Sequence, residues 1–176
     1  MGIEVSYRRI APAKFEELRS NPDLAEEFFY GDGVFGDRTS VYTDDIDTTS
    51  DLSIEKEWQA IHYLLTGEVA FDDASQTEPP VRNVVMGGTP TEWEATYNYV
   101  RFLTPDEVKE VANFLNDTPI EVLRAHFDAR GKTKIYTQGS SWSEDNWELL
   151  MRVYAHLVKF YNQAAAQGEV VLISSD

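Results

Sequence analysis

The sequence predicts a single α+β domain spanning residues 1–176, in which a mixed sheet packs against several amphipathic helices. Three observations support this prediction: apolar strand patterns at both ends of the chain, apolar stripes at helical spacing between them, and no regular alternation of strand and helix. A chain of this length buries roughly two-thirds of the surface that it exposes when unfolded, so it can build one core without disulfides or metals.

The first part of the chain carries strand and helix signals in close succession. Residues 3–9 alternate between apolar and polar side chains, which is typical of a half-buried strand. Pro12 favours the first turn of a short helix, because proline lacks the N–H group that this turn leaves unpaired. A second short helix follows and is expected to end at Gly31, where glycine readily adopts a positive φ. We expect residues 30–52 to form a long loop.

The middle of the chain begins with a predicted amphipathic helix. Ser53 is a suitable N-cap for this helix, and Gly67 is a suitable C-terminal stop. Between them, four apolar residues fall on one face at helical spacing: Ile54, Trp58, Ile61 and Leu65. After a polar, proline-ended segment, residues 81–86 are predicted to form a strand.

A four-residue pattern, Thr-Pro-x-Glu, begins at Thr89, Thr104 and Thr118. Each copy can form a capping box, in which Thr caps a helix, Pro occupies the first turn and Glu reaches back to the cap. The helices after Thr104 and Thr118 are expected to form a hairpin. The longest helix is predicted from Ser143 to Gly168, and a buried strand is expected directly after it.

Composition and charge restrict the function. Asp and Glu number 31 against 15 Lys and Arg, giving a formal net charge of −16 that repels phosphate backbones and anionic lipids. We therefore expect no nucleic acid and no membrane as partners. No signal peptide and no apolar run of about 18 residues are found, which predicts a cytoplasmic location. Without cysteine or a helical spacing of histidine and carboxylate ligands, we expect no metal and no cofactor.

His62 is the histidine whose neighbours suggest chemistry. It follows Trp58 by four residues and Glu55 by seven, so in a helix begun at Ser53 all three project from neighbouring positions. In this arrangement Glu55 can orient His62 as a general base, with Trp58 as the wall of a pocket. The alternative, which the sequence favours, is a histidine packed in the core with one hydrogen bond.

Interleaved aromatic residues indicate a second candidate pocket. Trp93, Tyr97 and Tyr99 precede Arg101, whose guanidinium is suited to an anion. Aromatic residues that precede a capped helix more often seal a core. Both interpretations stay open at this point.

Several motifs resemble those of a known family. The most specific is the block that runs from Trp58 through His62 to Leu65-Thr66-Gly67. The opening Met1-Gly2-Ile3 and the segment Leu103-Thr104-Pro105 accompany it. Together these motifs resemble the YfbM-like family of bacterial proteins of unknown function, over nearly the whole of residues 1–176. The resemblance implies an α+β fold and a bacterial cytoplasmic setting, and it implies no activity, cofactor or catalytic residue.

Two functional hypotheses follow. The first is a non-enzymatic acidic domain that binds a basic protein partner, for example an immunity or inhibitor protein against a basic toxin. The second is a small-molecule-binding domain or hydrolase, in which His62 acts with Glu55, Trp58 walls the pocket and Arg101 binds an anion.

Overall fold

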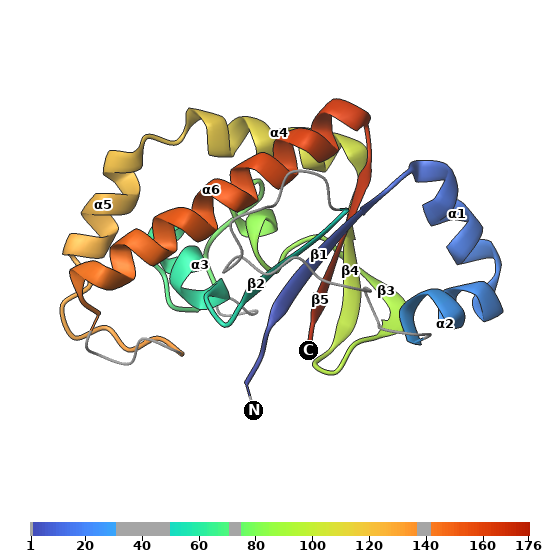
Figure 1. Cartoon of the computed structure of the whole chain (residues 1–176), viewed down its shortest axis with the longest axis horizontal. Helices are drawn as coiled ribbons and strands as arrows, with labels where there is room; N and C mark the ends of the chain where they lie inside the picture. The colour runs from blue at the N-terminus through green and yellow to red at the C-terminus, as the bar shows by residue number, and fades with distance from the viewer. Residues whose placement is uncertain (1, 31–49, 71–74, 137–141) are drawn as a thin grey trace.

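A five-stranded sheet forms the centre of the molecule (Figure 1). The computed structural model describes residues 2–30, 50–70, 75–136 and 142–176. Every pairing between the described strands is antiparallel, so the α+β prediction is confirmed with an antiparallel sheet in place of the expected mixed one. The order is β2-β1-β5-β4-β3, which places both ends of the chain in the middle. The strands are β1 (Val5–Ile10), β2 (Asp51–Glu55), β3 (Thr89–Glu94), β4 (Tyr99–Leu103) and β5 (Val170–Ser175).

Helices cover both faces of this sheet (Figure 1). One face is covered by α3 (Trp58–Thr66), α4 (Pro105–Asp117), α6 (Glu144–Gln167) and the 3₁₀ helix η1 (Val81–Val84), and α5 (Ile120–Asp128) packs on α3. The opposite face is covered by α1 (Pro12–Ser20) and α2 (Pro22–Tyr30). Within the described ranges, no helix is both long enough and apolar enough to cross a bilayer.

Strand β5 is buried over its whole length because it contributes side chains to two cores. Val171 and Ile173 belong to the larger core, beneath α3, α4 and α6. Val170 and Leu172 belong to the smaller core, beneath α1 and α2. A strand covered on both faces reads as a continuous apolar run, which is the pattern that predicted it.

Two buried tyrosine hydroxyls join the sheet, the long helix and η1. The Oη atoms of Tyr7 in β1 and Tyr161 in α6 both donate to the carbonyl oxygen of Val84, at 3.1 and 3.0 Å. The two rings meet edge to face, with centroids 6.0 Å apart. Burial raises the pKa of both tyrosines above the ordinary value. Because a buried polar group is costly unless it is paired, these bonds hold η1 against the core.

The helix predicted from Ser53 begins at Trp58 instead, because residues 51–55 form β2. Pairing with β1 places Ile54 in the larger core, where it is fully buried. Glu55 then adopts a φ of 53° at the end of the strand, and α3 begins shortly after it. Ile54 and Trp58 are thus spaced as in one helix, but Ile54 lies at the end of a strand and Trp58 is the first residue of the next helix.

The three Thr-Pro-x-Glu copies adopt different structures. The copy at Thr104 forms the predicted capping box, in which Thr104 and Glu107 exchange two hydrogen bonds. The copy at Thr89 starts β3 instead, because Thr89 pairs with β4 in a hairpin. At the third copy, the Thr118 hydroxyl donates back into α4, and Pro119 is the N-cap of α5.

Other predicted boundaries agree with the structure. Pro12 opens α1, and Gly67 ends α3 with a φ of 73°. Ser143 precedes α6, and its backbone N–H donates to the side-chain oxygen of Asn146 at 2.6 Å. Gly168 ends the same helix with a φ of 64°. These boundaries depend on local backbone chemistry, which the sequence carries directly.

Two other expectations have a different outcome. Residues 81–86 do not form the predicted strand, since η1 occupies the first part of this segment. The carbonyl oxygen of Val84 in η1 accepts hydrogen bonds from the hydroxyls of Tyr7 and Tyr161. Most of the loop expected at residues 30–52 lies outside the described residues, as does the helix stop expected at Gly31. The described chain resumes at Ser50 and enters β2 directly.

The shared carbonyl of Val84 leads to a prediction about stability. Tyr7→Phe and Tyr161→Phe each remove one hydroxyl without emptying the core, and each is expected to lower the free energy of unfolding by about 1 kcal/mol. The double variant removes both donors, so its expected loss exceeds the sum of the single losses and reaches about 3 kcal/mol. Urea denaturation of the four proteins measures these losses. Strictly additive losses would argue against a shared acceptor.

The raised tyrosine pKa values predict a loss of stability at alkaline pH. An unfolded tyrosine ionises near its ordinary pKa of about 10, whereas the two buried rings stay protonated. Above about pH 10 the unfolded state therefore releases protons that the folded state keeps, and the free energy of unfolding falls as pH rises. Urea midpoints measured between about pH 8 and about pH 11 test this. The double Tyr→Phe variant should show the weaker pH dependence, and an equal dependence would contradict the assignment.

Candidate functional site

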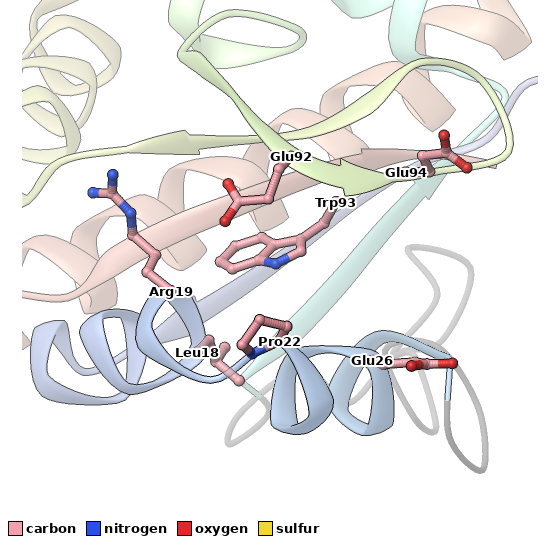
Figure 2. A pocket seen from close by; sticks show the side chains of 7 residues that line it. All are labelled: Leu18, Arg19, Pro22, Glu26, Glu92, Trp93 and Glu94. Carbon is pink, nitrogen blue, oxygen red and sulfur yellow. The ribbon is translucent and has the colours of Figure 1, made fainter.

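A charged, concave surface lies at the edge of the smaller core (Figure 2). Helices α1 and α2 form one side of it, and strand β3 forms the other. Its cavity has a volume of about 360 Å³, within the range of about 300–1,000 Å³ that is typical of ligand pockets. We call it the acidic groove. It is lined by Leu18, Arg19, Pro22, Glu26, Glu92, Trp93 and Glu94.

Trp93 forms the aromatic wall of the acidic groove. Its ring lies 6.0 Å from Phe15 of α1, edge to face, and 4.8 Å from Phe29 of α2. Its backbone N–H donates to the Thr91 hydroxyl, which in turn donates to the Val100 carbonyl of β4. These contacts fix the indole at the border of the smaller core, with 7% of the residue exposed.

Three carboxylates line the groove together with this indole. Glu26 of α2 and Glu92 and Glu94 of β3 are all exposed, and Glu26 and Glu92 form no ion pair within the part of the chain that the structure describes. Arg19 also lines the groove and lies 3.9 Å from the carboxylate of Glu16. The lining therefore carries a net negative charge. Among the described residues, no group of three or more His, Asp or Glu side chains is placed to hold a metal ion.

A second cavity of about 320 Å³ shares Glu94 with the acidic groove. Phe29 of α2 and Val100 of β4 supply apolar lining. Asp176, also in the lining, accepts hydrogen bonds from the backbone N–H and the hydroxyl of Thr96, at 3.3 and 3.1 Å. The two cavities are therefore neighbours along β3, with Glu94 between them.

The structure does not bring Glu55 and His62 together on one helix. His62 lies in α3 and is 3% exposed, and its Nε2 is 2.8 Å from the carbonyl oxygen of Ala70. Glu55 belongs to β2. Burial lowers the pKa of His62, and the Ala70 hydrogen bond and the charge of Glu68 only partly oppose this effect. His62 is thus a buried residue whose ring holds a backbone carbonyl.

Trp58 and Arg101 are also engaged in bonds within the protein. The buried Trp58 donates its indole N–H to the carbonyl oxygen of Ile3 at 3.0 Å. The guanidinium of Arg101 donates to the carbonyl oxygens of Gly87 and Gly88, at 2.9 and 2.6 Å. Neither side chain lines the acidic groove.

Of the residues predicted to line a pocket, Trp93 lies in the acidic groove. Tyr97 and Tyr99 belong to the β3–β4 hairpin region and are exposed, the latter to 50%. Sequence reasoning missed the carboxylates Glu26 and Glu92, because acidic residues on exposed faces are ordinary in a chain with this charge. The local signal that was available is the triplet 92–94, in which glutamates flank the tryptophan.

The fold and the groove define an acidic α+β domain with a charged, aromatic-walled surface. The chain belongs to the family described as a domain of unknown function, DUF1877, whose model matches residues 1–174. The family resemblance predicted from the Trp58 to Gly67 block is thereby confirmed, and the family is one of unknown function.

A solved structure with the same fold is that of YfbM from Escherichia coli, described as a protein of unknown function. It is 19% identical to this chain, and the match covers 98% of this chain and 99% of that one, with a TM-score of 0.67. At this identity the likeness concerns the fold. A search of curated proteins finds no match.

The burial of His62 predicts how its ring titrates. We expect a pKa below the ordinary value of about 6.5, because burial disfavours the charged imidazolium. As pH falls below about 6.5, the unfolded chain therefore takes up a proton that folded His62 does not, and the free energy of unfolding falls. An NMR titration of the histidine rings measures this pKa. A value above 6.5 would instead indicate a water-accessible imidazole paired with an acid, as the hydrolase hypothesis requires.

Proposed function

We propose that the protein is a non-enzymatic binding domain of the cytoplasm that recognises a basic partner protein through its acidic groove. An immunity or inhibitor protein against a basic toxin is one concrete form of this function. The observation that carries the proposal is the groove itself. It combines a rigid aromatic wall, Trp93, with the carboxylates of Glu26 and Glu92, which form no ion pair within the described residues.

The charge of the whole chain supports the same function. A formal net charge of −16 creates a long-range field that accelerates encounter with a basic protein. Such a field acts on any cation, so it supplies attraction without selectivity. The groove adds a concave surface on which the attracted partner can be oriented. Because exposed charges are screened over about 8 Å at physiological ionic strength, this binding is expected to weaken with salt.

A hydrolase that uses His62 with Glu55 receives less support from the geometry. A general base must lie within hydrogen-bond reach of the proton that it removes, whereas His62 is buried and its Nε2 is bonded to Ala70. Glu55 lies in a different element. The lining of the acidic groove contains carboxylates but no histidine, serine, threonine or lysine, so it lacks the nucleophile of a serine- or threonine-dependent hydrolase and the histidine that the hydrolase hypothesis requires. Binding is therefore the function that the geometry supports best.

The proposal predicts that a basic partner is retained through the groove and not through net charge alone. Wild-type protein on a resin should retain a basic protein from the lysate of its host at low salt and release it at high salt. The variant Glu26→Lys/Glu92→Lys should lose this protein. The matched control, Glu110→Lys/Glu148→Lys, changes two exposed residues of α4 and α6 and has the same net charge.

The comparison between the two double variants decides the result. Retention by the control and loss by the groove variant would support the proposal. Equal loss in both would show that net charge alone attracts the partner. The absence of any salt-sensitive basic partner would contradict the proposed function as a whole.

A further inference from the structure

The indole N–H of Trp93 is a polar group that the fold leaves without an acceptor. Trp93 is 7% exposed, lines the acidic groove, and donates from Nε1 to no acceptor among the described residues. By contrast, the buried indole of Trp58 donates to a backbone carbonyl. This nitrogen is not among the buried atoms that lack a partner, so it can be reached from the groove, and a ligand that brings an oxygen acceptor to this edge of the ring forms a hydrogen bond without breaking one within the protein.

The ring of Trp93 cannot easily turn to find another acceptor. Phe15 packs against it edge to face, with an interplanar angle of 85°, and Phe29 packs at 34°. Figure 2 shows the indole between Glu92 and Pro22, with its nitrogen on the edge toward Pro22. The N–H is therefore held in place before a ligand arrives, and binding does not require this side chain to be ordered.

The carboxylates beside the indole select a cation. Glu92 precedes Trp93 on β3, and Glu26 lines the same groove from α2 with its carboxylate directed away from the indole. A guanidinium suits this position better than an ammonium, because it is planar, less strongly hydrated and able to donate to two carboxylate oxygens at once. Arg19 lines one rim of the groove, where it lies over the ring of Phe15 and 3.9 Å from the carboxylate of Glu16. Because the lining contains one arginine and several glutamates, its net charge is negative.

We propose that the acidic groove binds an extended, arginine-containing segment of the partner protein. The arginine guanidinium pairs with the carboxylate of Glu92, and a backbone carbonyl oxygen of the same segment accepts the hydrogen bond from Trp93 Nε1. A peptide supplies both groups on one chain, whereas an acidic ligand is repelled and a simple cation lacks the acceptor. The inference rests on the proposed function, whose partner it defines chemically.

The neighbouring cavity agrees with an extended ligand. It shares Glu94 with the acidic groove and is lined by Phe29 and Val100 as well as by polar groups. A single arginine side chain does not need this second space. A segment of several residues can place its cation in the groove and its next side chains in the second cavity.

The probe is the capped peptide acetyl-Gly-Arg-Gly-amide, titrated into the ¹⁵N-labelled full chain. We expect the indole N–H resonance of Trp93 to shift downfield, while those of Trp58, Trp142 and Trp147 stay in place. Trp93→Phe keeps an aromatic ring in the core but lacks the donor, and it should weaken binding about fivefold. Glu92→Gln removes one exposed carboxylate and should weaken binding about two- to fivefold. Glu148→Gln is the matched control and should bind like the wild type.

Three arms can overturn the inference. Propylguanidinium carries the same single positive charge without the carbonyl, and binding as tight as that of the peptide would exclude recognition by Trp93. Equal binding of acetyl-Gly-Glu-Gly-amide would exclude the cation. A Trp93 resonance that the arginine peptide does not move would exclude the site. If one of these occurs while the groove variant still loses its basic partner in the capture experiment, the inference is wrong and the proposed function stands. Failure of both experiments rejects both.

Discussion

The pairing of β1 with β5 is the constraint on which the rest of the structure depends. It joins the two ends of the chain in an antiparallel register in which Val5 faces Ser175 at one end and Ile10 faces Val170 at the other. The central strand β5 is thereby buried on both faces, and each face must be covered by apolar side chains. The long helix α6 and its neighbours cover one face, and α1 and α2 cover the other. The acidic groove lies where this second layer meets the edge strand β3.

The same edge strand explains why we expect recognition by side chains and not by strand addition. β3 contains Pro90, and its register with β4 is irregular between Pro90 and Glu94. Proline and irregular pairing both discourage a further strand from adding to an edge. Trp93 lies within the irregular stretch, with its ring in the smaller core. One local feature therefore blunts the sheet edge and also supplies the wall of the groove.

Elements were predicted correctly where local preference agrees with tertiary packing. The capping box at Thr104 and the limits of α6 at Ser143 and Gly168 are examples. The predictions failed at Ser53 and Thr89, where cap-like sequences lie in strands. A helix cap contributes about 1 kcal/mol, whereas burial of one large apolar side chain contributes about 1.5–3 kcal/mol. Pairing in the sheet buries such side chains, so the segments that contain Ser53 and Thr89 form strands and not helix starts.

The amino-acid sequence was sufficient for the α+β class, the family, the acidic charge and Trp93 as a candidate wall. Tertiary packing alone decided that Glu26 faces the groove of Trp93, and that Glu55 lies in a different element from His62. The physical reason is the range of the interactions. Spacing along the chain determines which residues share a helix or a strand, whereas a site between α2 and β3 depends on how the whole core is buried.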